Sequence, residues 1–241
     1  MDEAAPTGEK KYKCEKCHDT GWIYWTDEKG YSFGKECECQ KVEKARRIFE
    51  NSGILNGQRD ITFKAFQTFD NPVLVNAKEK AVRYFQNFEA LEKEKYNSIL
   101  LCGQVGAGKT HLGIALSNNL ITRMIAVIYM PYRNVITALK QNITNDEVYN
   151  RELSKYLNAR VLYIDDMLKG RITESDVNIM FEIVNHRYLN QLPMIVTTEK
   201  TVDELLAFDE AVGSRIIEMC KGNIIFFPKG MDLNYRLRGA V

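Results

Sequence analysis

Eight residues near the middle of the chain, Gly103-Gln104-Val105-Gly106-Ala107-Gly108-Lys109-Thr110, constrain its fold more than any other segment. They match G-x-x-x-x-G-K-[S/T], in which glycines let successive backbone N–H groups point at one phosphate. The run follows an apolar segment, 98–102, and precedes a helical pattern from His111 to Leu120. This is the strand, loop and helix that a phosphate-binding loop requires. The alternative is a glycine-rich turn with an exposed lysine.

The loop predicts a bound nucleoside triphosphate. Its eight residues and the following His111 are the expected nucleotide contacts. Lys109 is expected to reach the β- and γ-phosphates, and Thr110 is expected to ligate Mg²⁺.

Composition sets the remaining limits. The 241 residues leave room for one full α/β domain and a small appendage, and 45% hydrophobic residues supply a core. The net charge of +1 does not by itself indicate binding to nucleic acid or to a membrane, so any such binding site must be a local charged patch. No apolar run is long enough for a membrane span, and residues 1–6 lack the apolar core of a signal peptide. We therefore expect a cytoplasmic protein.

Apolar runs alternate with helical patterns beyond residue 97. This alternation predicts a five-stranded parallel sheet with helices on both faces. The expected strands are 98–102, 126–130, 161–165, 194–198 and 223–227. The expected helices are 111–120, 134–141, 175–189 and 202–219. The polar segment 137–158 is expected to be a solvated helix pair or, alternatively, a surface for DNA or a partner.

Four of the six cysteines precede residue 40, as Cys14-x2-Cys17 and Cys37-x-Cys39. Two close thiolate pairs supply the four tetrahedral ligands of Zn²⁺, although four cysteines also hold iron–sulfur clusters. The run 22–25 is expected to form a hairpin wall over this site. Cys102 and Cys220 have no metal-binding spacing and are expected to be structural.

These features divide the chain into three parts. Residues 1–53, which include a helix of mixed charge over 40–51, form the expected zinc-binding module. Residues 54–61 form a linker, and residues 62–241 form the P-loop domain.

Two acids end the expected third strand, at Asp165 and Asp166. In a P-loop fold, the first acid holds Mg²⁺ through its water shell beside Thr110. The second acid orients and deprotonates the attacking water, so we assign that role to Asp166. A strand that simply ends in a polar turn is the alternative.

The chain resembles bacterial and phage helicase loaders of the DnaC/DnaI type, which are AAA+ ATPases. The resemblance covers nearly the whole chain. It rests on the paired cysteines with Asp19-Thr20-Gly21, on Thr62-Phe63, on the P-loop, and on the segments 164–166, 197–200 and 213–216. It implies a zinc-bearing N-terminal domain that grips a hexameric replicative helicase. It also implies an ATPase domain that engages single-stranded DNA and self-associates head to tail through ATP.

The resemblance also implies roles for further residues. A polar residue after the fourth strand senses the γ-phosphate, for which Thr198 and Glu199 are candidates, although the family often has Asn there. Arg215 is the expected finger into a neighbouring subunit's site. Arg236 is a candidate for a phosphate contact in cis, and Arg187 for either a contact in trans or packing.

We expect slow ATP hydrolysis that is stimulated by DNA or a partner. Asp166 stands where many AAA+ ATPases have the longer Glu, and the 14 residues after Phe227 leave no room for a helical lid. ATP then acts as a switch for assembly and release. Lys140, Lys169 and Arg171 are candidates for DNA contact or are solvated surface.

Three other functions remain open. A transposition helper ATPase of the IstB-like type acts with a transposase on duplex DNA, but the cysteine module argues against it. A small-molecule P-loop kinase requires an Arg-rich lid that the sequence lacks. A zinc-dependent interaction module with a vestigial ATP site is opposed by the intact Lys109, Thr110, Asp165 and Asp166.

Overall fold

The computed structural model describes residue 12 and residues 14–237. Residues 1–6, on which the expected lack of a signal peptide rests, lie outside them. The chain forms two compact units that divide between Arg47 and Ile48. This division falls within helix α1 (Glu38–Ser52), before the module boundary that we expected at residue 53.

The first unit contains an antiparallel hairpin of β1 (Trp22–Thr26) and β2 (Ser32–Glu36). Its turn is fixed by Asp27, whose Oδ1 accepts the backbone N–H groups of Lys29 and Tyr31, both at 2.9 Å. The expected hairpin is therefore present. Its aromatic side chains are largely exposed, including Trp22 and Trp25 at 47% each.

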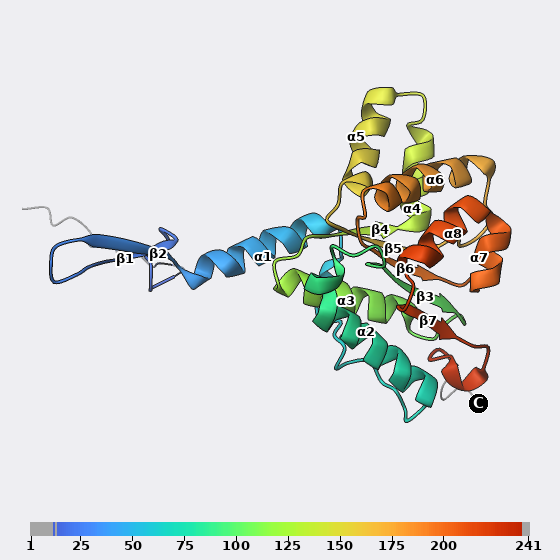
Figure 1. Ribbon diagram of the computed structural model, residues 1–241, viewed down its shortest axis with the longest axis horizontal. Helices are drawn as coiled ribbons and strands as arrows, with labels where there is room; N and C mark the ends of the chain where they lie inside the picture. The colour runs from blue at the N-terminus through green and yellow to red at the C-terminus, as the bar shows by residue number, and fades with distance from the viewer. Residues whose placement is uncertain (1–11, 13, 238–241) are drawn as a thin grey trace, which may run out of the picture. The chain divides into compact units, whose positions relative to one another are not determined.

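The second unit is built on a five-stranded parallel sheet with the order β4-β5-β6-β3-β7, which confirms the expected fold class (Figure 1). The strands are β3 (Ile99–Gly103), β4 (Val127–Pro131), β5 (Val161–Met167), β6 (Met194–Thr198) and β7 (Ile224–Phe227). Because β3, β5 and β6 are adjacent and parallel, their carboxyl ends meet at one edge of the sheet.

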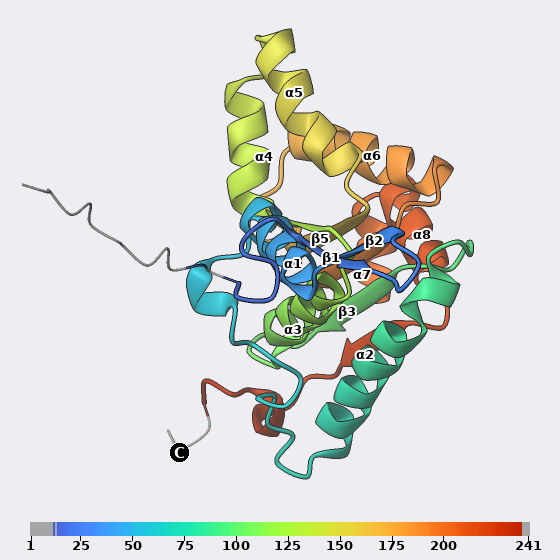
Figure 2. The same ribbon diagram turned by 90° about the vertical axis from the view of Figure 1, so that its left-hand side faces the viewer.

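Helices cover both faces of this sheet (Figures 1 and 2). Helices α2 (Pro72–Leu91) and α3 (Lys109–Thr122) pack on one face, against strand residues such as Leu101, Tyr163 and Ile195. Helices α4 (Tyr132–Gln141), α5 (Asp146–Leu157) and α6 (Glu174–Leu189) lie on the other face, in a core cluster with strand residues such as Leu100 and Val196. Successive strand residues thus face opposite layers, as the pleat requires. The expected helix pair in 137–158 corresponds to α4 and α5.

The expected single helix 202–219 is wrong, because the structure has two helices there. They are α7 (Val202–Phe208) and α8 (Glu210–Met219). Between them, Asp209 adopts an extended conformation with φ −157°, and its side chain accepts the N–H of Val212. An aspartate in this position caps a new helix. The apolar residues keep their helical spacing on both sides of Asp209, so the sequence pattern does not reveal the break.

Helix α2 was not expected from the sequence. Asn71 caps it by accepting the N–H groups of Val73 and Leu74, and Pro72 occupies the first turn, where its missing N–H costs nothing. Its buried face repeats at helical spacing, through Leu74, Ala77, Ala81, Tyr84 and Phe88.

The expected linker 54–61 includes a short 3₁₀ helix, η1 (Asn56–Gln58). The Asn118 amide on α3 donates to the carbonyl oxygens of Gln58, Arg59 and Ile61, at 2.9, 3.2 and 3.0 Å. This end of the segment is therefore fixed to the sheet unit. Among the described residues, none of the helices is long and apolar enough to cross a membrane.

Candidate functional site

The loop 103–110 connects the carboxyl end of β3 to the first turn of α3. Gly106 and Gly108 have φ values of +74° and +84°, which favour glycine. A Cβ atom on Gly106 would lie 2.2 Å from Asn234 Oδ1, and one on Gly108 would lie 2.6 Å from Phe66 Cε2. The conformation and the close neighbours both require glycine, as a phosphate cradle does.

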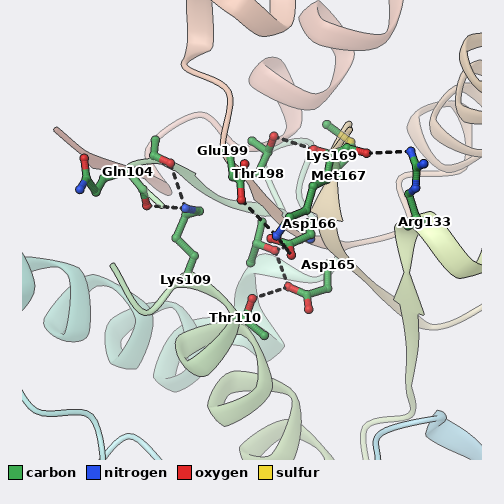
Figure 3. Close-up of polar contacts among 12 residues, drawn as sticks. Gln104, Lys109, Thr110, Arg133, Asp165, Asp166, Met167, Lys169, Thr198 and Glu199 are labelled. Carbon is green, nitrogen blue, oxygen red and sulfur yellow. Dashed lines mark hydrogen bonds and ion pairs between the residues drawn. The ribbon is translucent and has the colours of Figure 1, made fainter. Parts of the chain in front are cut away.

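Lys109 is buried at the start of α3 (Figure 3). Its Nζ donates to the carbonyl oxygens of Gly103 and Gln104, at 2.9 and 2.6 Å. Burial lowers the pKa of Lys109. The Gln104 amide donates to the carbonyl oxygen of Gly230 at 3.1 Å and accepts its N–H at 3.3 Å, which ties the loop to the segment after β7.

Asp165, near the end of β5, is held by four hydroxyl groups. Its Oδ1 accepts from Thr110 at 2.9 Å, Tyr163 at 2.8 Å and Thr197 at 2.6 Å, and its Oδ2 accepts from Tyr129 at 3.0 Å. The carboxylate is 6% exposed and lies beside the hydroxyl of the P-loop threonine. These residues therefore fit the water shell of Mg²⁺, which takes oxygen ligands.

Asp166 has a left-handed backbone, with φ +53°. Its N–H donates to Thr197 Oγ1 at 2.9 Å, and its Oδ2 pairs with Lys169 Nζ at 2.7 Å. Lys169 Nζ also lies 3.1 Å from Glu199 Oε1 (Figure 3). The structure thus brings both predicted acids and Glu199 together at one edge of the sheet. It also places Lys169, which was expected to be a DNA contact or solvated surface, beside Asp166 and Glu199.

The two sensor candidates differ in position. Thr198 is fully buried, and its Oγ1 donates to the carbonyl oxygen of Met167 at 2.7 Å. Glu199 lines the cavity beside Lys109. Of the two, Glu199 is therefore the side chain that a bound nucleotide can reach.

The loop borders a cavity of about 350 Å³. Its lining includes Thr110, His111 and Arg236, in addition to Asp166, Glu199 and the two lysines described above. The Phe66 ring lies against the rings of His111 and Tyr235, with centroids 5.5 and 5.7 Å apart. This volume is typical of small-molecule sites, and an aromatic wall next to a phosphate cradle fits a nucleoside phosphate.

Two arginines from the sequence prediction lie outside this cavity. Arg187 is fully buried and donates to the carbonyl oxygens of Tyr156, Leu157, Ala159 and Pro193. Because these bonds hold the Arg187 guanidinium inside its own chain, Arg187 has a packing role and is not available to contact another subunit.

Arg215 on α8 lies apart from the P-loop. Its guanidinium donates to the Ala211 carbonyl at 2.7 Å and lies 5.3 and 5.5 Å from the ring centroids of Phe181 and Tyr188. It therefore makes no contact with the phosphate cradle of its own chain.

The four cysteine sulfurs of the first unit lie within 4.8 Å of one another. The Cys14–Cys37 and Cys17–Cys39 sulfurs are 3.8 and 3.4 Å apart, close to the roughly 3.8 Å edge of a ZnS₄ tetrahedron with 2.3 Å bonds. The backbone N–H of Cys17 lowers the pKa of Cys14 to about 7, which favours its thiolate. The cluster is thus compatible with zinc. Cys102 and Cys220 are buried, as expected.

A family model described as IstB-like ATP binding protein matches residues 39–218. The chain belongs to this family of AAA+ ATP-binding proteins. It is 34% identical to the phage-like element PBSX protein XkdC of Bacillus subtilis (strain 168), over 99% of this chain and 91% of that protein. It is 26% identical to the replicative helicase loader DnaC of Escherichia coli (strain K12), over 90% of this chain and 86% of that protein.

The fold has a solved counterpart. A crystal structure of the DnaC helicase loader covers 72% of this chain and 99% of its own, with a TM-score of 0.61 and 19% identity. At this identity, the likeness concerns the fold alone.

Tyr129, Tyr163 and Thr197 were not predicted as site residues, and Lys169 was predicted only as a DNA contact or solvated surface. Tyr163 stands two residues before Asp165 on the same strand, so the period of two places both on one face. Tyr129 is its register partner on β4. The strand alternation was therefore a usable signal for Tyr163, whereas Thr197 and Tyr129 required the strand order.

Proposed function

We propose that this protein is an ATP-dependent loader of the replicative DNA helicase onto single-stranded DNA. The observation that carries the proposal is that a P-loop site with its two acids shares one chain with a separate four-cysteine unit. The similarity to a helicase loader over 90% of the chain supports it.

The site residues are suited to bind ATP and to hydrolyse it slowly. The loop N–H groups and Lys109 hold the phosphates, and Thr110 and Asp165 hold Mg²⁺. When bound, the metal neutralises charge on the β- and γ-phosphate oxygens. Asp166 orients a water and accepts its proton as the water oxygen attacks the γ-phosphorus. ADP then leaves with the electron pair of the broken bond.

ATP serves as a switch for assembly in this proposal. Arg215 of one subunit contacts the γ-phosphate in the next subunit and stabilises its negative charge. Hydrolysis removes that phosphate and dissolves the contact, so the assembly and the helicase separate. The Phe181 and Tyr188 rings beside Arg215 hold the guanidinium in place until a neighbour binds.

The first unit grips the helicase. Zinc bound by Cys14, Cys17, Cys37 and Cys39 fixes the fold of this unit, which is too small to bury a large core. Exposed aromatic side chains on its hairpin, such as Trp22 and Tyr24, supply the contact area. Lys140 and Arg171 lie near each other at α4 and before α6, where they can meet DNA phosphates.

Native mass spectrometry of the zinc-loaded protein with the host's hexameric helicase tests this proposal. We expect an ATP-dependent complex that Cys14→Ser and Cys37→Ser abolish, while both variants still bind ATP. The absence of a complex with wild-type protein at micromolar concentrations contradicts the proposal.

A transposition helper is the second candidate, favoured by the description of the matching family. It predicts binding to duplex DNA and to a transposase, without any need for the helicase. Filter binding to duplex and single-stranded oligonucleotides of the same sequence separates the two functions.

A further inference from the structure

Lys169 joins two carboxylates in the nucleotide cavity. Its Nζ lies 2.7 Å from Asp166 Oδ2 and 3.1 Å from Glu199 Oε1 (Figure 3), in the cavity lined by Lys109 and Thr110. The side chains of Lys169, Asp166 and Glu199 are 42%, 36% and 30% exposed. These ion pairs are therefore open to the cavity, and an entering ligand can reach the ammonium group.

The backbone that carries Lys169 is strained. Asp166 and Leu168 have φ values of +53° and +61°, a conformation that residues other than glycine rarely adopt. Such strain persists only where the surrounding structure imposes it, and it gathers at functional sites.

Contacts from two neighbouring elements hold this segment. Thr198 Oγ1 on β6 donates to the Met167 carbonyl at 2.7 Å. Arg133 Nη1 on α4 donates to the carbonyl oxygens of Lys169 and Arg171, at 3.4 and 3.3 Å. The position of Lys169 is thus fixed on both sides by the fold.

The two acids of the cavity favour cations in addition to Lys109, and the lining supplies Lys169 and Arg236. Asp166 and Glu199 would both repel the γ-phosphate of a triphosphate held by the loop, and the charge of Lys109 would be shared between the β- and γ-phosphates. Lys169 is located where it offsets that repulsion. Pairing with Asp166 raises the pKa of Lys169, so its charge persists at neutral pH.

We propose that Lys169 is a γ-phosphate ligand in cis, a role that rests on the proposed binding of ATP at the P-loop. On binding of ATP, the ammonium group exchanges Glu199 for a γ-phosphate oxygen and stays beside Asp166. ADP has no group at this position. Lys169 therefore makes the site distinguish ATP from ADP.

The ratio of ATP to ADP affinity, measured by calorimetry with Mg²⁺ present, tests this role. We expect Lys169→Met to weaken ATP at least tenfold and to change ADP affinity less than twofold, whereas Lys169→Arg retains most of the preference. Lys200→Met removes a nearby charge outside the cavity and is expected to leave both affinities unchanged. An equal loss for both nucleotides, or no loss for either, overturns the proposal.

Lys109→Ala separates this proposal from the function on which it rests. If Lys109→Ala leaves ATP and ADP affinity unchanged, binding at the P-loop is itself wrong. If Lys109→Ala abolishes binding, but Lys169→Met weakens ATP and ADP binding equally or weakens neither, only the role of Lys169 fails.

Discussion

Thr197→Val tests how the fold holds the two acids. The buried Thr197 hydroxyl donates to Asp165 Oδ1 at 2.6 Å and accepts the Asp166 N–H at 2.9 Å. Valine keeps the shape and loses both bonds. A hydrogen bond to a charged group contributes about 1.5–3 kcal/mol, and the bond lost by the partly buried Asp166 N–H contributes about 0.5–1.5 kcal/mol. We therefore expect the free energy of unfolding of the sheet unit to fall by about 3 kcal/mol.

Far-ultraviolet circular dichroism during heating measures this loss, because most helices belong to the sheet unit. For a unit of this size, about 3 kcal/mol corresponds to a fall in Tm of about 6–12 °C. Both tryptophans, Trp22 and Trp25, lie in the first unit, so their fluorescence should not shift.

Thr197→Ser is the matched control, since it keeps the hydroxyl and should recover most of the stability. A Thr197→Val protein within about 0.5 kcal/mol of wild type, the range of ordinary surface changes, refutes the reasoning. So does a Thr197→Ser protein that is as unstable as Thr197→Val.

Three further substitutions test the other parts of the account. Asp166→Asn should lower the rate of phosphate release about 100-fold or more and leave ATP affinity within a few-fold, because the catalytic base is lost; unchanged turnover excludes that role. Arg215→Ala should abolish ATP-dependent oligomers in sedimentation velocity without weakening ATP binding to the monomer, and oligomers that persist would exclude the finger. Arg187→Met should reduce the free energy of unfolding by about 3 kcal/mol in urea, because two buried and two partly buried carbonyl oxygens lose their donor; a neutral result would contradict its structural role.

Local patterns were sufficient to predict the sheet. The apolar runs are long enough to identify each strand, and the observed strands start within one residue of the expected positions. The break at Asp209 and helix α2 were missed for different reasons. The break depends on the Asp209 cap, which leaves the apolar pattern around it unchanged, whereas helix α2 carried usable local signals, the Asn71-Pro72 start and a helical repeat of buried residues, that were not interpreted.

The site was only partly predictable. The P-loop comes directly after β3, and Asp165 and Asp166 lie near the end of β5. The positions of these strands in the sequence therefore predict the positions of the site residues. Lys169 was interpreted as a DNA contact or solvated surface, because sequence cannot show that a strained turn directs its side chain back towards Asp166. Thr197 reaches Asp165 only because β5 and β6 are neighbours, which no local pattern reveals.

The most direct test of the central claim is helicase loading onto a covalently closed circle of single-stranded DNA, since a closed hexamer cannot thread onto it without a loader. With wild-type protein and ATP, we predict helicase that stays on the circle through gel filtration and is released by linearising the DNA. With the Lys109→Ala variant, we predict that no helicase stays on the circle. Equal amounts of bound helicase with and without this protein would contradict the account.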